Sequence, residues 1–303
     1  MDTTPLGRLT IFATSLIAYI AFLAAMIGTV VFLTGAAKFP DVDQGASTPA
    51  PVAVAVDLAL LGIFALQHTV MARQGFKRWL TQVVPATSER SLFVLAASFA
   101  LLLLLWQWRP IPETVWVLHT PLSTILWAVY AAGWLLVVAS TFMIDHFDLF
   151  GLRQSWLALR GRTYSPPEFQ IRWLYARVRH PIMSGFLIAI WATPSMSAGH
   201  LLFAAASTAY IGVGVWFEER DLIRSIPAYS AYRQSVGAFV PSLTALWSGR
   251  DQAISGPNLA RREEGAGRPA HRYLVGRMGL SGLADLQDRA GVGGDRGRDH
   301  EHG

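Results

Sequence analysis

Residues 181–217 decide the fold, and they read PIMSGFLIAIWATPSMSAGHLLFAAASTAYIGVGVWF, without a single Asp, Glu, Lys or Arg. A membrane-spanning helix needs about 17–25 predominantly apolar residues, so this stretch is roughly long enough for two of them. Pro194 and Gly199 near its middle favour a turn. The pattern therefore predicts a hairpin of two membrane helices, the first of them unusually short.

Four further apolar stretches precede this hairpin, and each is long enough for one membrane span. The stretches are Thr10–Leu33, Val52–Ala72, Ser91–Trp108 and Pro121–Ile144. Only the second contains ionisable side chains, Asp57 and His68, and we expect Asp57 to lie at the outer interface. The sequence thus predicts an all-α polytopic membrane bundle of about six hydrophobic helices, of which the last two form the hairpin.

The composition agrees with a membrane protein and excludes several other classes. Of the 303 residues, 52% are hydrophobic and 15% are charged, whereas soluble domains carry about 25% charged residues. This apolar content excludes a disordered chain. The chain has no Cys, which excludes a disulfide scaffold, a Cys-ligated zinc or iron–sulfur site and a Cys nucleophile.

Basic residues fall almost entirely on one side of the predicted bundle. With the N-terminus inside, all 25 Lys and Arg residues except Lys38 and Arg109 lie on the inner side. Because cytoplasmic loops are enriched in Lys and Arg, we expect an N-in, C-in protein of a bacterial-type inner membrane. The net charge of +5 then reflects these loops, so the lipid bilayer is an expected partner and nucleic acid is not. The sequence carries no prediction of the oligomeric state.

The chain divides into two parts of different composition. Residues 1–247 hold every apolar stretch and form the predicted membrane domain. Residues 248–303 are rich in Gly and Arg and have Tyr273 as their only aromatic residue. Such a segment buries too little apolar surface to offset its ordering entropy, so we expect a disordered tail.

Polar side chains gather in two inner segments that flank the hairpin. Arg179-His180-Pro181 lies directly before it, and Glu218-Glu219 lies directly after it. If the hairpin closes, these basic, imidazole and carboxylate groups lie side by side at one membrane depth. A simpler interpretation is that they only mark the interface, where long charged side chains extend toward water.

The order of motifs along the chain resembles a known group of membrane enzymes. Arg-His-Pro, Ser-Gly, an apolar hairpin and Glu-Glu-Arg-Asp-Leu are similar to the pattern of the isoprenylcysteine carboxyl methyltransferase and phospholipid methyltransferase superfamily. Residues 10–245 more closely resemble its bacterial methanethiol S-methyltransferase family. The supporting motifs are Gln-His-Thr-Val-Met-Ala-Arg at 67–73, Asp-His-Phe-Asp-Leu-Phe-Gly at 145–151, Tyr-Ala-Arg-Val-Arg-His-Pro at 175–181 and Trp-Ala-Thr-Pro at 191–194.

This resemblance implies transfer of a methyl group from S-adenosylmethionine to methanethiol, a small volatile thiol, giving dimethyl sulfide. In the superfamily, the segment around Arg-His-Pro and the paired glutamates hold the cofactor. The corresponding cofactor-binding residues here are Tyr175, Arg177, Arg179, His180, Pro181, Met183, Gly185, Phe217, Glu218 and Glu219. Members often have Tyr two residues after the Pro, and this chain departs from them with Met183.

The chemistry of these side chains suits a sulfonium donor with a zwitterionic amino-acid end and an adenosine. Arg177 or Arg179 would pair with the carboxylate, and either glutamate would accept hydrogen bonds from the ammonium or the ribose. The rings of Tyr175 and Phe217 would lie against the adenine or the sulfonium. Gly185 would allow close approach of the cofactor or of a neighbouring helix.

Methyl transfer to a thiol also needs a group that takes the thiol proton, because a free thiol with a pKa of about 8.5 is mostly protonated at neutral pH. His146 is the first candidate base, since Asp145 and Asp148 flank it and carboxylates orient imidazoles. His180 is the second candidate base. The alternative for His146 is an ordinary capping role at the end of its helix. His68 lies level with these groups and is a candidate substrate residue or a bundle-facing hydrogen-bond partner. No metal site is predicted.

Methylation of methanethiol has three alternatives. The acceptor could be another thiol, a lipid or a prenylated cysteine. A haem-binding or nitrogen-oxide-response membrane protein would need two facing histidines among His68, His146 and His180. A transporter would need polar groups near the bilayer midplane and two related halves, and the sequence shows neither.

Overall fold

The computed structural model of the protein describes residues 4–35, 41–165 and 173–242. Five of its helices are long and apolar enough to cross a membrane: α1 (Pro5–Thr34), α2 (Ala50–Ala72), α4 (Glu89–Gln107, with the preceding turn η1, Ala86–Ser88), α5 (Leu122–Ile144) and α9 (Ala198–Ser225). A shorter apolar helix, α8 (Pro181–Trp191), comes directly before α9. The all-α membrane bundle and its short helix before the last span are therefore confirmed.

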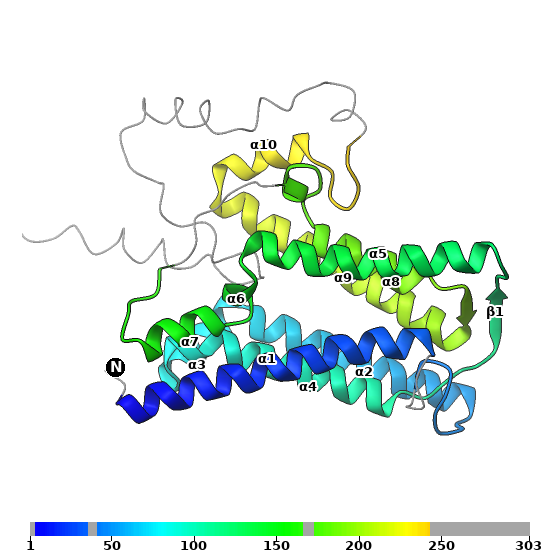
Figure 1. Ribbon diagram of the computed structural model, residues 1–303, viewed down its shortest axis with the longest axis horizontal. Helices are drawn as coiled ribbons and strands as arrows, with labels where there is room; N and C mark the ends of the chain where they lie inside the picture. The colour runs from blue at the N-terminus through cyan, green and yellow to red at the C-terminus, as the bar shows by residue number, and fades with distance from the viewer. Residues whose placement is uncertain (1–3, 36–40, 166–172, 243–303) are drawn as a thin grey trace, which may run out of the picture.

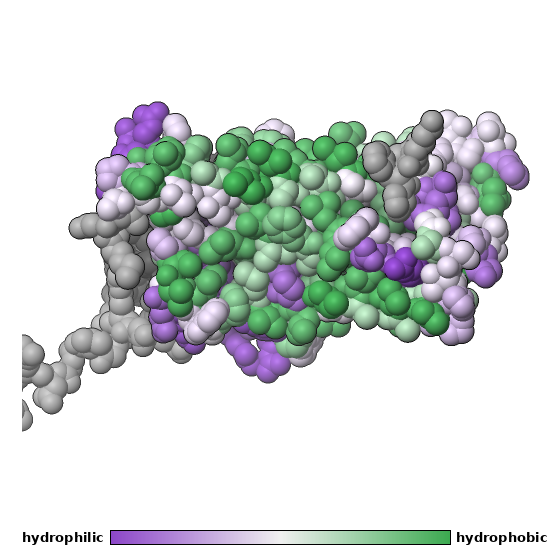
Figure 2. Space-filling view, turned by 90° about the horizontal axis from the view of Figure 1, so that it is seen from below, coloured by the Kyte–Doolittle hydropathy of each residue, from purple (hydrophilic) through white to green (hydrophobic). Residues whose placement is uncertain are grey.

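Apolar side chains cover the outside of the bundle. Ile27, Leu66 and Leu135 on three different helices are 63%, 67% and 69% exposed. The space-filling view shows apolar residues along most of the visible face, with hydrophilic ones mainly toward the ends (Figure 2). Because these side chains would be costly to expose to water, the outer surface of the helices suits contact with lipid.

The hairpin turn contains a short strand that was not predicted. Between α8 and α9, β2 (Ser195–Ser197) pairs antiparallel with β1 (Thr114–Val117), which precedes α5. The Ser197 side chain then accepts a hydrogen bond from the backbone N–H of His200 and caps α9. Strands of four and three residues are too short to show a period-2 pattern, so no signal in the sequence indicated this element.

Helices α5 and α8 pack closely because two glycines face one another. A Cβ added to Gly185 would lie 2.7 Å from the Gly133 carbonyl oxygen, and one added to Gly133 would lie 2.9 Å from the Gly185 carbonyl oxygen. Close backbone approach through small residues is common between membrane helices. Tyr130 on the same helix α5 donates a 2.7 Å hydrogen bond to the Val30 carbonyl of α1.

Asp57, which we predicted to be interfacial, lies in the N-terminal third of α2 and is fully buried within the protein. Its carboxylate accepts a 2.9 Å hydrogen bond from the backbone N–H of Arg109, just after α4 ends. Burial of a carboxylate is costly, and this hydrogen bond from the backbone offsets part of that cost.

The short helices lie toward the end of the bundle opposite the two strands (Figure 1). They are α3 (Gln74–Val83), α6 (His146–Leu149), α7 (Leu152–Leu159), η2 (Trp173–Ala176) and α10 (Pro227–Ser235). The inner polar segments of the sequence lie at this end. Its orientation toward the cytoplasm stays a prediction from the basic residues, and the predicted tail, 248–303, lies outside the described residues.

Candidate active site

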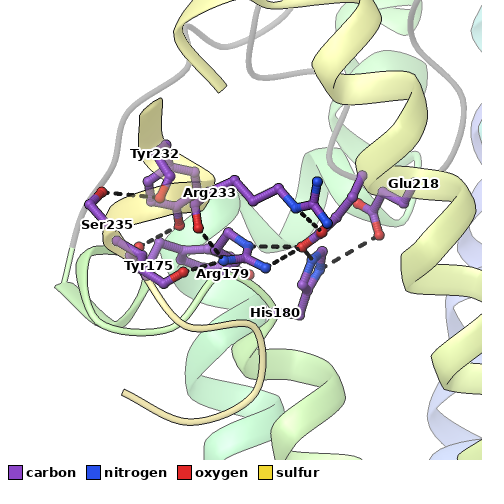
Figure 3. Close-up of polar contacts among 9 residues, drawn as sticks. Tyr175, Arg179, His180, Glu218, Tyr232, Arg233 and Ser235 are labelled. Carbon is purple, nitrogen blue, oxygen red and sulfur yellow. Dashed lines mark hydrogen bonds and ion pairs between the residues drawn. The ribbon is translucent and has the colours of Figure 1, made fainter. Parts of the chain in front are cut away.

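The hairpin brings Arg179-His180 and Glu218-Glu219 together. His180 precedes α8 directly, and both glutamates lie in the last turns of α9, which continues through them to Ser225. Arg179, His180 and Arg233 point toward the same place beside Glu218 (Figure 3). We call Arg179, His180, Glu218, Glu219 and Arg233 the charged cluster.

Glu219 is the centre of the charged cluster. Its Oε1 accepts from Arg179 Nε at 2.8 Å and Nη2 at 2.7 Å, and from His180 Nε2 at 3.1 Å. Its Oε2 pairs with Arg233 Nε at 3.0 Å. The Glu219 side chain is 9% exposed, and a charge that is so deeply buried needs this number of partners to offset its desolvation.

Arg179 connects the hairpin to the segment that follows it. Its Nη1 donates to the carbonyl oxygens of Arg233, at 2.9 Å, and Val236. The backbone N–H of Arg179 donates to the Gly237 carbonyl at 2.9 Å, and that of His180 donates to the Ala238 carbonyl at 3.0 Å. Four of the five guanidinium N–H groups are used inside the protein, so Arg179 joins chain segments and has little left for a ligand.

Glu218 differs from its neighbour. Its side chain is 11% exposed, and the contact the structure gives it among the described residues is His180 Nδ1, 3.7 Å from Oε2. Burial, together with the nearby charge of Glu218, raises the pKa of the Tyr175 phenol above its usual range. Glu218 is therefore a nearly buried carboxylate that retains most of its hydrogen-bonding capacity, as expected of a group that binds a cation or hydroxyl.

Helix α10 covers the charged cluster. No function was predicted from the sequence for its residues. Tyr229 and Tyr232 are buried among Leu222, Ile226 and Val236. The Tyr232 hydroxyl donates a 2.5 Å hydrogen bond to the Tyr175 carbonyl. Burial raises the pKa of both tyrosines above the usual range. The three- and four-residue spacing of these apolar positions is helical, and it was the available signal for α10.

The other predicted cofactor residues lie around the cluster in different settings. Arg177 is exposed, Pro181 is fully buried at the first position of α8, and Met183 is half-buried in its first turn. Gly185 faces Gly133 of α5, so it serves the helix contact rather than the charged cluster. The Phe217 ring lies under the Arg73 guanidinium, 4.6 Å from its centroid, which directs it toward α2.

His146 lies in a second polar group formed with Tyr19 and Thr141, which we call the imidazole cluster. Its Nε2 is 2.8 Å from the Tyr19 hydroxyl, and its Nδ1 is 2.8 Å from the Thr141 hydroxyl. Burial lowers the pKa of His146 below its usual range. The predicted orientation by carboxylates is thus wrong: two hydroxyls from α1 and α5 hold the ring.

The two carboxylates that flank His146 stabilise the corner between α5 and α7 instead. Asp145 has φ 111°, a left-handed conformation that is rare outside Gly, and its side chain accepts from the Asp148 N–H at 3.2 Å. Asp148 accepts from Arg153 at 3.3 Å and from the Tyr164 hydroxyl at 3.0 Å. Burial raises the pKa of Asp148 against these two contacts. Both residues therefore shape the corner that places His146.

His68 is on α2 and faces α4 and α9. Its Nδ1 is 2.9 Å from the Tyr210 hydroxyl, and its ring lies 5.0 Å from that of Phe93. The three histidines considered as haem ligands thus bond to different partners: Tyr210, Tyr19 with Thr141, and Glu219. Over the described ranges, no three His, Cys, Asp or Glu side chains are grouped to hold a metal ion.

Comparison with known proteins places this arrangement in a family. A family model described as NnrU protein matches residues 58–217. Methanethiol S-methyltransferase of Mycobacterium tuberculosis is 51% identical, over 74% of this chain and 92% of its own length. Methanethiol S-methyltransferase 2 of Bradyrhizobium diazoefficiens is 48% identical, over 79% and 93%. Bovine nurim (Bos taurus) is 29% identical over 55% of this chain and 66% of its own length. No solved structure matches the chain.

The helical bundle and its relatives define a membrane protein of the isoprenylcysteine carboxyl methyltransferase-like superfamily. Within that superfamily, the chain belongs to the methanethiol S-methyltransferase family, and it carries the NnrU family pattern over residues 58–217.

Proposed function

We propose that this protein is an S-adenosylmethionine-dependent thiol S-methyltransferase that converts methanethiol into dimethyl sulfide at the cytoplasmic face of the membrane. The names of its relatives support the reaction class and the acceptor. The observation that carries the proposal for this chain is Glu218, a carboxylate that is nearly buried in the charged cluster and, over residues 4–35, 41–165 and 173–242, has one long contact, 3.7 Å to His180. A cationic ligand would complete its coordination.

The residues of the cluster would divide the binding of the donor among them. Glu218 would accept from its ammonium group or ribose hydroxyls. The Arg233 side chain is 51% exposed and pairs with Glu219 through Nε. Its terminal N–H groups suit the carboxylate of the donor, as does the exposed guanidinium of Arg177. Tyr175 would lie against the adenosine, since its phenol is close enough to Glu218 for that charge to contribute to its raised pKa.

Glu219 and Arg179 would act by holding this arrangement rather than by contacting the ligand. Their mutual pairing fixes the start of α8, the end of α9 and the segment after α10 in one place. A donor sulfonium, when bound, supplies a methyl group to a nucleophile in one displacement. The chain's own task is to align the two reactants and exclude water, and the buried tyrosines of α10 provide a water-excluding cover.

The acceptor side would be the aromatic layer between the two histidines. His68 contacts Phe93, which packs in one apolar cluster with Tyr19, Phe22 and Phe150, and the Phe150 ring lies 4.9 Å from that of His146. Thiol and thioether sulfur make favourable contacts with aromatic rings. An apolar thiol dissolved in the bilayer would find in this layer a more favourable setting than in water.

The test is methyl transfer by purified, detergent-solubilised protein given methyl-labelled S-adenosylmethionine and methanethiol. We expect label in volatile dimethyl sulfide, and loss of that product in Glu218→Gln. Competing acceptors added at equal concentration would identify a different thiol, a lipid or a prenylated cysteine as the preferred substrate. Absence of any labelled product, together with absence of donor binding, would contradict the proposal.

A further inference from the structure

The imidazole cluster fixes the protonation form of His146. The Thr141 hydroxyl donates its one hydrogen to the Val138 carbonyl, 2.7 Å away. Its oxygen can then only accept from His146 Nδ1, so Nδ1 carries the ring hydrogen of the neutral imidazole. The other nitrogen, Nε2, is left with a lone pair and accepts from the Tyr19 hydroxyl at 2.8 Å. His146 is thus a neutral base whose basic atom is covered by a tyrosine.

The surroundings of this base are aromatic and almost free of charge. The Phe142 ring stacks on the imidazole with centroids 4.3 Å apart, and Phe147 and Phe150 meet it edge-on. The titratable groups that face the imidazole are Tyr19 of α1 and Asp145 at the α5–α6 corner. Asp148 of α6 is occupied with Arg153 and Tyr164. Burial keeps His146 neutral, as a base must be before it accepts a proton.

We propose that Tyr19 is the catalytic residue that accepts the thiol proton, with His146 as the base behind it and Thr141 as the residue that positions His146. This assignment rests on the proposed function. The S–H bond of the thiol breaks and its proton forms a new O–H bond with Tyr19. The original Tyr19 proton moves to His146 Nε2 in the same step. The products are the thiolate, an intact tyrosine and an imidazolium. The Nδ1–H of the imidazolium still donates its hydrogen bond to the Thr141 hydroxyl oxygen.

The position of Tyr19 explains why it, and not His146, would meet the substrate. Its hydroxyl covers Nε2 of the imidazole on the side opposite Thr141, and its ring packs beside Phe22 in the aromatic layer. Ser15, one helical turn earlier on α1, bonds to Ser91 near the start of α4, so Tyr19 lies about 6 Å further along α1 than that contact, toward the middle of its apolar length. An apolar thiol arriving from lipid would reach the hydroxyl before the buried imidazole.

The kinetic test uses Tyr19→Phe, with Tyr130→Phe as the matched control. Both variants lose a hydroxyl that links α1 to the α5–α6 segment, since Tyr130 bonds to Val30 and Tyr19 bonds to His146. We expect Tyr19→Phe to lower kcat for methanethiol about 10²- to 10⁴-fold, with unchanged affinity for the donor. Its rate should rise with pH as the thiol ionises unaided, while Tyr130→Phe keeps the wild-type profile. Wild-type kcat in Tyr19→Phe would overturn the inference.

The role of Thr141 has a readout that does not depend on turnover. In protein labelled with ¹⁵N-histidine, the His146 signals, assigned by their loss in His146→Asn, should report the Nδ1–H form. Thr141→Val should shift the ring toward a mixture of forms and lower kcat, and Thr141→Ser should restore both. A wild-type ring protonated at Nε2 would overturn the relay while leaving the proposed function intact. A wild type that methylates no thiol would instead contradict the proposed function, whatever the ring form.

Discussion

The two polar clusters lie at the end of the bundle opposite the two strands, and they have different roles and use different groups. The charged cluster uses three cationic or imidazole side chains to hold Glu219, and through it three segments of chain. The imidazole cluster uses two hydroxyls to hold one neutral ring. Full charges suit strong, long-range joining of segments, whereas neutral hydroxyls fix a tautomer without changing the charge of the base.

The comparison also separates two glutamates that are adjacent in the sequence. Both side chains are nearly buried, but Glu219 is bound on both oxygens, whereas Glu218 has one contact, at 3.7 Å, within the described part of the chain. One carboxylate thus belongs to the protein, and the other is available to a ligand. The predictions below test this separation and the contrast between the clusters.

The largest effect is expected for Glu219→Gln. The change leaves the buried Arg179 guanidinium without its carboxylate partner, and uncompensated buried charges cost about 3–5 kcal/mol. Thermal unfolding in detergent should show the loss of stability directly. The matched control is Asp221→Asn on the same helix, whose half-exposed carboxylate lies 3.8 Å from Arg73 and should contribute less than about 1 kcal/mol. Equal losses in the two variants would contradict the central position of Glu219.

A smaller loss is expected for Gly185→Ala. The added methyl group would lie 2.7 Å from the Gly133 carbonyl and 2.8 Å from Val137, so α5 and α8 must separate, at about 1–3 kcal/mol. Because α5 leads to the imidazole cluster and α8 begins at the charged cluster, methyl transfer should fall as well. Gly212→Ala is the control, since nothing lies within 4 Å of its added Cβ. A wild-type unfolding temperature in Gly185→Ala would show that this contact is not tight.

The smallest effect is expected for pH. Burial lowers the pKa of His146 in the folded protein, whereas an unfolded chain binds this proton near pH 6.5. Stability from the neutral ring is therefore complete above that pH and decreases as the pH falls through 6.5 toward the folded value. Unfolding temperatures between pH 7.5 and 5.5 should fall more steeply for the wild type than for His146→Asn. Parallel curves would mean that the imidazole cluster does not keep its base neutral.

The sequence predicted the bundle well because the membrane imposes a simple rule. In lipid, a long apolar stretch without charges, such as Pro121–Ile144, pairs its backbone N–H and C=O groups by forming a helix. Helix α5 accordingly spans Leu122–Ile144. The closing of Arg179-His180 onto Glu218-Glu219 followed from the same rule, because a hairpin returns the chain to the depth at which it entered.

The division of roles within the site did not follow from the sequence. The pairing of Arg179 with Glu219 and with the carbonyls after α10 depends on a packing that no local pattern encodes. Tyr19 and Thr141 lie 127 and 5 residues from His146, and neither carries a charge that would single it out in an apolar helix. The sequence favoured the neighbouring carboxylates as partners for His146, but the Asp145 carboxylate accepts from the Asp148 backbone N–H, and the Asp148 carboxylate binds Arg153 and Tyr164.

The most direct test of the central claim is calorimetric titration of S-adenosylmethionine into detergent-solubilised wild-type and Glu218→Gln protein at equal concentration. Hydrogen bonds to a charged group contribute about 1.5–3 kcal/mol. The wild type should therefore bind the donor about 10- to 100-fold more tightly than the variant, with both unfolding at the same temperature. Equal affinities in two equally stable proteins would show that Glu218 does not contact the donor, and would contradict the assignment of this site.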